Sequence, residues 1–458
     1  MKFNLLFCLV IIISIISFAS AEERLHIVLS NEQNFVFMEN DGAGKFTPKS
    51  TVDVSPQAHE ITAGDFDLDG IWDAAVNHHQ EGAFTVLWGS NDKTFVKEKF
   101  VIPIVQGGEM HGIGSGDFDE DGDIDLALVD NGQTLSVIIA LSDGRRGFSE
   151  YRRNDMINNR NARIIAIDYF NDDKHLDFIV PESGGGDYFI FFGDGKGNFD
   201  MKEILGGGSL HDISSGDIDN DGDIDAAFAS FTSIAVLKNN GKGEFTFSDK
   251  FCIKNTQGTC TDPDFYTVEL SDLDNDGFMD VIGLRADGIY IWRGDGTGKF
   301  KASARKPASV EFVQVFRNSI DIESFDVDSN NIGDIMIGAL DGVQTGILVF
   351  KNKIDTTGCK GPDPNDPTKT VNLGPGPICI DSVVKYSAGR TNFGDQVMID
   401  VYVETLGDVK MPAFTRGDAN QDKAVDLSDA VYLLQYLFSG GEKPKCLDSA
   451  DFDDTGII

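Results

Sequence analysis

The stretch Asp65-Phe-Asp67-Leu-Asp69-Gly70-Ile-Trp-Asp73 decides the fold of this chain, because closely similar stretches recur about every fifty residues. Each copy places carboxylates at positions one, three, five and nine of a tight turn. Carboxylates arranged in this way converge on one point and repel one another unless a hard cation such as calcium lies between them. The glycine at position six lets the backbone turn sharply. The carboxylates of the four closest copies are Asp65, Asp67, Asp69 and Asp73; Asp117, Asp119, Asp121 and Asp125; Asp217, Asp219, Asp221 and Asp225; and Asp272, Asp274, Asp276 and Asp280.

Short β-strand patterns follow each acidic turn. After the second copy, one apolar run begins at Asp125 and another β-rich run covers residues 136–140. Glycine-rich hairpin sequences that end in phenylalanine also recur, as in Asp194-Gly-Lys-Gly-Asn-Phe199. The repeating unit is therefore four short strands in about fifty residues, which is the size of one propeller blade. Residues 25–350 lack sustained helical periodicity, so the predicted fold class is all-β.

The number of acidic turns predicts the number of blades. Six turns, including two weaker copies, indicate six units, and residues 25–50 supply strands of a seventh unit. A chain that begins within a blade and completes that blade with its other end closes a ring without free sheet edges. We therefore expect a seven-bladed β-propeller over residues 22–354. The two weaker copies carry Asn171, Asp173 and Asp177, and Asp326, Asp328, Asn330 and Asp334.

Charge and the first residues bound the class of protein. The 458-residue chain has a net charge of −37, which argues against nucleic acid as a partner because phosphate binding needs a basic face. Lys2, an apolar run from Leu5 to Phe18 and Ala19-Ser-Ala21 form a signal-peptide pattern over residues 1–21. We expect a secreted protein with no membrane insertion after cleavage.

The cysteines fit an oxidising compartment. Cys252 and Cys260 bracket a short loop, and Cys359 and Cys379 bracket a proline-rich one, so the sequence predicts two local disulfides. Cys446 is then left over.

The repeats resemble the FG-GAP/VCBS family of calcium-binding propellers, which includes the integrin α-subunit head. The resemblance implies that the carboxylates of each turn hold one structural calcium ion. The third turn departs from the pattern, with Tyr169 for the first acid and Lys174 for the glycine, so we expect no metal there. The sixth turn has Asn330-Asn331 in place of Asp-Gly, so we expect weak metal binding.

The C-terminal part changes character. Residues 355–377 read as a Pro/Gly-rich linker and residues 378–411 as a short β-rich segment. Residues 412–458 resemble a type I dockerin, with one calcium loop followed by a helix over residues 430–438. Lys423 replaces the usual glycine, and a second loop begins at Asp451 without its later ligands. The resemblance implies a cohesin partner and the loop ligands Asp418, Asn420, Asp422, Asp426 and Asp429.

Histidines share one register of the repeat. His59, His111 and His211 each lie six residues before the first acid of a turn, and Tyr266 occupies this position in the fifth unit. In a propeller we expect this position near the ring axis, on the face opposite the acidic turns, so the four side chains are a candidate ligand-binding site. The alternative is that each imidazole only ties its own blade by hydrogen bonds. Zinc is disfavoured here, because ligands from separate blades would have to meet at one ion.

The sequence carries no recognised catalytic constellation. Carboxylates that hold calcium are poor proton shuttles, which disfavours a glycosidase pair. We predict a secreted calcium-binding propeller that binds an extracellular protein or glycan and carries a dockerin-type anchor. The alternatives are a lectin, or a polysaccharide-active lyase or hydrolase.

Overall fold

The computed structural model describes most of the chain between residues 22 and 406. The described ranges are 22–30, 32–105, 108–132, 134–156, 161–182, 187–204, 210–230, 233–252, 265–285, 288–306, 322–330, 332–341, 344–355, 360–363, 366–372, 376–390 and 398–406. Arg24–Glu404 forms one compact unit. Regular structure in these ranges is β-strand throughout, and no helix suited to crossing a membrane is found among them.

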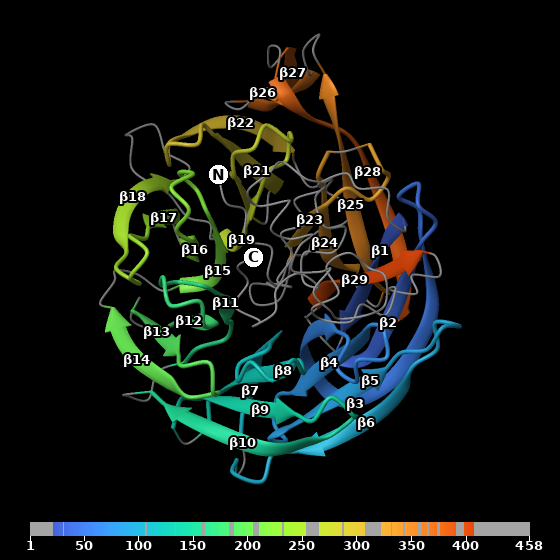
Figure 1. Ribbon diagram of the computed structural model, residues 1–458. Helices are drawn as coiled ribbons and strands as arrows, with labels where there is room; N and C mark the ends of the chain where they lie inside the picture. Colours follow the sequence, from blue (N-terminus) through green and yellow to red (C-terminus); the bar gives the residue numbers. More distant parts are fainter. Residues whose placement is uncertain are drawn as a thin grey trace, which may run out of the picture. The chain divides into compact units, whose positions relative to one another are not determined.

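Seven antiparallel blades are arranged as a ring within this unit (Figure 1). Five blades are separate four-stranded sheets, and the other two share one seven-stranded sheet through the long strand β3. Residues 46–53 of β3 pair with β2 and residues 61–64 pair with β4 in the next blade, while Ala58 pairs with both strands. The strands of the shared sheet are β1 (Glu22–Ser30), β2 (Glu32–Asn40), β3 (Phe46–Gly64), β4 (Asp73–His78), β5 (Ala83–Trp88), β6 (Val96–Val101) and β29 (Met398–Leu406).

The five separate blades repeat one strand order. Each runs from an innermost strand to an outermost one, and the outermost strand leads into the next blade. Their strands are β7 (Met110–Gly116), β8 (Asp125–Asp130), β9 (Ser136–Ser142) and β10 (Phe148–Asp155); β11 (Ala166–Asp168), β12 (Asp177–Pro181), β13 (Tyr188–Gly193) and β14 (Phe199–Ile204); β15 (Leu210–Gly216), β16 (Asp225–Ser230), β17 (Ile234–Lys238) and β18 (Thr246–Phe251); β19 (Phe265–Ser271), β20 (Asp280–Arg285), β21 (Gly288–Gly294) and β22 (Phe300–Lys306); and β23 (Ile322–Phe325), β24 (Asp334–Asp341), β25 (Gln344–Asp355) and β28 (Gly376–Arg390).

The ring closes with strands that the sequence analysis placed outside the propeller. β28 is the outermost strand of the last blade, and β29 is the innermost strand of the blade formed with β1, β2 and the first half of β3. The predicted end of the propeller at residue 354 was therefore wrong, as was the separate β-rich segment 378–411. The predicted linker 355–377 also contains a two-stranded sheet, β26 (Lys360–Asp363) and β27 (Asp366–Asn372). The error arose because the partners of β29 lie more than about 350 residues away, and local patterns do not reveal such pairings.

Apolar side chains hold neighbouring blades together. The residue at position two of each turn is apolar, and Phe66, Phe118 and Phe170 are almost completely buried there. Trp88 belongs to a cluster shared by two adjacent blades, and Trp292 lies in a similar cluster. The buried side chain at position two thus attaches each acidic turn to the apolar core between blades.

Candidate functional site

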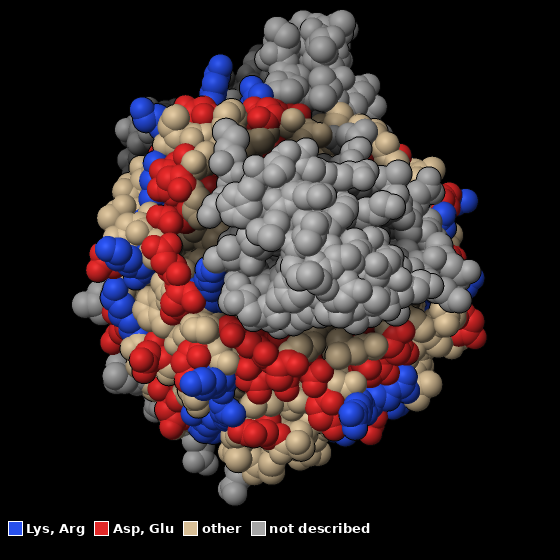
Figure 2. Space-filling view, in the orientation of Figure 1, with Lys and Arg blue, Asp and Glu red and all other residues tan. Residues whose placement is uncertain are grey.

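The acidic turns all connect the first strand of a blade to its second strand. They occur between β3 and β4, β7 and β8, β11 and β12, β15 and β16, β19 and β20, and β23 and β24. Because every innermost strand runs in the same direction, the six turns lie on one face of the ring, which we call the turn face. Figure 2 shows acidic side chains in patches on the visible side of the molecule, with lysine and arginine side chains beside them.

Backbone donors shape each turn around its first carboxylate. The N–H groups of Asp69 and Gly70 donate to the Asp65 carboxylate at 3.1 and 2.9 Å. Gly70 has φ +84°, a left-handed conformation that favours glycine. One ligand atom each from Asp65, Asp67 and Asp73 lies within 4.8 Å of the others. Three further turns bring together Asp117, Asp119 and Asp125; Asp217, Asp219 and Asp225; and Asp272, Asp274 and Asp276.

The carboxylate at position three carries an unsatisfied oxygen. The Oδ1 atoms of Asp119, Asp219, Asp274 and Asp328 are buried and have no hydrogen-bond partner. A buried carboxylate oxygen without a partner is costly, so it favours a positive charge at its own position, although Lys238, Arg293 and Lys351 already pair with the other oxygen of Asp219, Asp274 and Asp328. A cation coordinated by the turn would provide that charge.

The carboxylate at position nine has a separate task in the fold. Both oxygens of Asp73 accept backbone N–H groups, from Phe66 at 3.0 Å and from Gly89 at 2.7 Å. These bonds tie the turn to the end of the third strand, and burial raises the pKa of Asp73 to about 8. The same two bonds recur at Asp125, Asp177, Asp225, Asp280 and Asp334. The spacing of the carboxylates predicted only a metal ligand at this position, and its structural role becomes visible only in the fold.

The two irregular turns keep this framework. In the third turn, Lys174 takes the left-handed conformation of the usual glycine, with φ +72°, and Asp173 N–H donates to Asn171 at 2.6 Å. In the sixth turn, Asn330 N–H donates to Asp326 at 3.0 Å. The described residues of both turns therefore keep hydrogen bonds typical of the other turns, although their side chains offer fewer carboxylates.

Basic side chains already contact several turns. Lys238 Nζ lies 2.6 Å from Asp219, and Arg293 pairs with both Asp274 and Asp276. Lys351 contacts Asp328 at 3.4 Å. These three basic residues occupy the same position in their blades. Each directly precedes the residue whose backbone N–H donates to the position-nine carboxylate. The same register holds Trp88, Leu141 and Phe192 in the other blades.

The predicted histidine register coincides with a bulge in the innermost strand. In β3, the partners of Ala58 and Ile61 on β4 are two residues apart, so the first strand carries one extra residue at His59 and Glu60. Similar irregularities occur at His111 in β7, at His211 in β15 and at Tyr266 in β19. A bulge redirects the side chain of the extra residue, which is common beside binding sites.

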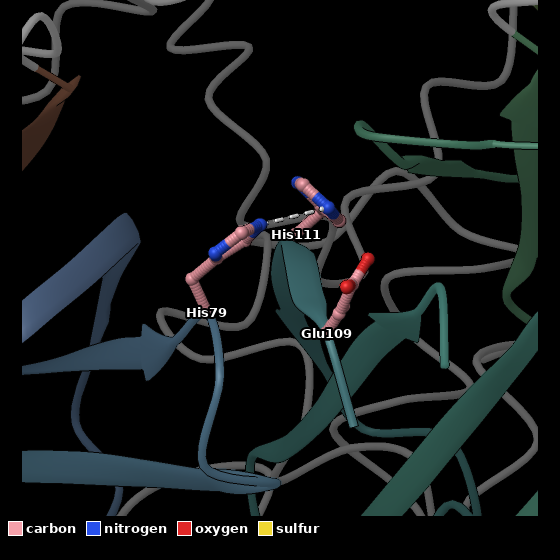
Figure 3. Close-up of side chains that lie close together, drawn as sticks. All are labelled: His79, Glu109 and His111. Atoms are coloured by element: carbon pink, nitrogen blue, oxygen red, sulfur yellow. Dashed lines mark hydrogen bonds between the residues drawn. The ribbon is translucent and has the colours of Figure 1, made fainter. Parts of the chain in front are cut away.

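Two of the predicted histidines meet a third that the sequence analysis missed. The ring centroids of His59 and His111 are 5.1 Å apart, and His79 stacks on His59 at 5.5 Å. His79 Nε2 lies 3.2 Å from His111 Nε2 (Figure 3). We call these three residues the histidine cluster. His79 directly follows β4, on the face opposite the turn face, and the His78-His79 pair at a strand end was its only signal in the sequence.

Burial keeps the histidine cluster neutral. Burial, together with His79 and Arg163, lowers the pKa of His59 to about 3, although a backbone hydrogen bond with His111 opposes this effect. Burial, together with His59, His79 and Arg163, lowers the pKa of His111 to about 2. Burial also lowers the pKa of His79, although nearby Glu109 opposes this effect. Neutral imidazoles offer lone pairs to a ligand or a metal ion.

The other predicted side chains lie elsewhere or outside the described residues. His211 and Tyr266 are partly exposed, and β15 is two blades further around the ring than β7, which carries His111. The structure therefore does not gather all four residues at one point. Cys252 is disulfide-bonded. Its predicted partner Cys260 lies outside the described residues, as do Cys359 and the predicted calcium loop with its helix, residues 412–458.

Known proteins share this architecture. A sequence profile for FG-GAP-like repeats matches residues 65–128, 217–282 and 272–337. No curated protein sequence matches the chain. An Agrocybe aegerita lectin, solved for its recognition of non-reducing terminal N-acetylglucosamine, is 16% identical with a TM-score of 0.50, over 81% of this chain and 96% of the lectin.

Two further solved structures extend the comparison. A protein of unknown function from Desulfotomaculum acetoxidans is 12% identical with a TM-score of 0.50, over 71% of this chain and 92% of that one. A candidate 6-phosphogluconolactonase from Bacteroides fragilis is 10% identical with a TM-score of 0.52, over 82% and 97%. At these identities the likeness concerns the fold alone. The protein is a seven-bladed β-propeller, and its blades contain FG-GAP-like repeats.

Proposed function

We propose that this protein is a calcium-stabilised extracellular propeller that binds a glycan or protein ligand. The observation that carries the calcium assignment is the buried Oδ1 atom without a partner at position three of four turns. In each of three of these turns, the position-three carboxylate lies within 4.8 Å of two further carboxylates. Calcium accepts six to eight oxygen ligands in a tolerant geometry, which suits carboxylates supplied by one flexible turn.

The proposed calcium ions would be structural. Each ion would offset the repulsion among carboxylates of a turn that joins the first two strands of a blade. Binding to the folded state alone adds its free energy to folding. The charge of −37 supports this role, because many of the acids lie in the turns and their repulsion opposes a compact state.

The binding role rests on the fold and on the absence of a recognised catalytic set. A lectin that recognises terminal N-acetylglucosamine has the same architecture, which makes a saccharide the first ligand class to test. Propellers also serve unrelated activities, so fold alone does not assign a ligand. The signal-peptide pattern at residues 1–21 supports export, and the dockerin-like sequence at residues 412–458 supports anchoring through a cohesin.

Two measurements test this proposal. Calcium titration by calorimetry on the exported chain should show several binding sites, with fewer sites in Asp119→Asn and Asp219→Asn variants. A chain that binds no calcium would contradict the metal assignment. A glycan array in millimolar calcium should then show saturable binding to a defined sugar class, whereas a blank array would overturn the saccharide preference and leave protein ligands.

A further inference from the structure

The histidine cluster is a second, chemically different site on the opposite face from the acidic turns. His59 and His111 lie on the innermost strands of adjacent blades, and His79 follows the second strand of the first of these blades. Figure 3 shows His79 and His111 joined at their Nε2 atoms, with the Glu109 side chain projecting beside them. One ligand atom each from His79, Glu109 and His111 lies within 4.8 Å of the others.

We propose that His79, His111 and Glu109 bind one divalent transition-metal ion of borderline softness, with zinc as the best fit. Two zinc–nitrogen bonds of about 2.05 Å at a tetrahedral angle place the nitrogens about 3.3 Å apart. The observed Nε2–Nε2 separation is 3.2 Å. Imidazole and carboxylate oxygen are both ordinary zinc ligands, whereas calcium takes oxygen ligands only.

The backbone around the three ligands is fixed by bonds between elements. The N–H of His79 donates to the carbonyl of Gln57 at 3.0 Å. The Asn77 side chain donates to the carbonyl of His111, which ties β4 to β7 across the two blades. The N–H of Glu109 donates to Asp130 Oδ1 at 3.1 Å. Such anchoring holds the ligands in position before a metal arrives, which reduces the entropy lost on binding.

The environment keeps the ligands available. His111 is 6% exposed and its Nδ1 atom is buried with no hydrogen-bond partner, as is Nδ1 of His59. His79 is partly exposed and Glu109 is exposed, so an ion could reach the site from solvent. The charged groups nearby oppose one another: Arg163 disfavours a cation, whereas Glu109 favours one.

His59 is a positioning residue in this proposal. Its ring packs against both zinc-binding imidazoles, with centroids 5.5 Å from His79 and 5.1 Å from His111. Its Nδ1 atom lies 4.0 Å from Glu60, and His59 is not among the three residues whose ligand atoms lie within 4.8 Å of one another. Zinc was disfavoured from the sequence because its ligands would come from separate blades, but His79, directly after β4, and His111 on β7 of the adjacent blade lie 3.2 Å apart at their Nε2 atoms.

Zinc titration of the whole mature chain tests the site. Calcium is kept in millimolar excess, so that the acidic turns are occupied and zinc reports on nitrogen ligands. The unaltered chain should bind about one equivalent of zinc. The His79→Gln and His111→Gln variants should bind zinc at least about tenfold more weakly, since even the loss of a residue that only hydrogen-bonds to a metal ligand weakens binding that much. Glu109→Gln should weaken binding to a smaller extent.

His211→Gln is the matched control, because His211 occupies the equivalent bulge of β15, two blades away from the bulge that holds His111. It should leave zinc binding unchanged. His79 is partly exposed, so its variant is expected to fold, and melting without zinc checks this. Cobalt offers a second readout, since its visible spectrum should show tetrahedral coordination with nitrogen ligands that is lost in His79→Gln.

Two results would overturn the proposal. One is equal zinc affinity and stoichiometry in the unaltered chain and in the His79→Gln, His111→Gln double variant. The other is an equal loss in His211→Gln, which would place any bound zinc elsewhere. Either result would reduce the His79–His111 contact to a hydrogen bond between neutral rings. Because calcium binding is measured separately, failure of the zinc site leaves the proposed calcium function untouched.

Discussion

The turn face and the histidine cluster differ in how the molecule makes them. The turn face repeats one acidic loop in six blades, and each loop draws all its carboxylates from nine consecutive residues. Among the described residues the histidine cluster occurs once, between two neighbouring blades, and it draws on three separated positions. A local site can be copied with its repeat, whereas a site between blades depends on how the particular blades pack. Predictions that remove one site and spare the other test this difference.

The largest expected effect is on the turn face. Removal of calcium with a chelator should lower the melting temperature by about 10 °C or more, because several sites each contribute a few kcal/mol. Differential scanning calorimetry in calcium and in chelator measures the change. Asp121→Ala in calcium should cost less than chelation, since it damages one turn only. Identical melting curves in both buffers would refute the structural role of calcium.

The position-nine carboxylate should matter with or without calcium. Asp177→Asn replaces one accepting oxygen by an NH2 group, which faces a backbone N–H of Phe170 or Gly193. One buried hydrogen bond would be lost and two N–H donors would face each other, so the free energy of unfolding should fall by about 2–3 kcal/mol. Thermal unfolding should give the same decrease in calcium and in chelator, because this turn is the one predicted to lack metal. A decrease seen only in calcium would instead indicate that Asp177 is a ligand.

The histidine cluster should make stability depend on pH. The folded pKa values of His59 and His111, about 3 and 2, lie below the ordinary value of 6.5. The neutral rings therefore contribute stability above pH 6.5 that is lost as the pH falls toward the folded values. At pH 5 the loss should reach about 2 kcal/mol for each ring.

A matched pair of variants isolates this pH effect. His111→Gln should flatten the fall in melting temperature between pH 7 and pH 5, whereas His175→Gln should not. His175 pairs with Glu120 at the turn face, and this contact raises the pKa of His175. An unchanged slope in His111→Gln would show that other groups cause the acid sensitivity.

The smallest effect concerns the bases at the turn face. Arg293 pairs with Asp274 and Asp276, so it competes with a cation for the same carboxylates. Arg293→Gln should raise the calcium affinity of this turn several-fold and lower stability in chelator by about 1 kcal/mol. Titration should thus show a higher calcium affinity, whereas melting in chelator should show a lower melting temperature. A weaker calcium affinity would instead mean that Arg293 orders the turn for the ion.

The sequence by itself determined the repeat, the all-β class, the seven blades and the acidic turns. These features are local: the carboxylate spacing and the glycine act within nine residues, and the alternation of apolar residues acts within one strand.

Only the tertiary structure decided how the ring closes and where the histidines meet. β29 completes a blade begun by residue 22, and His79 joins His59 and His111 through a turn outside their shared register. Both depend on contacts between segments that local patterns do not link, because strand pairing and blade packing are set by the whole ring. The six acidic turns needed no such information, since a nine-residue loop carries its own ligands and its own bend.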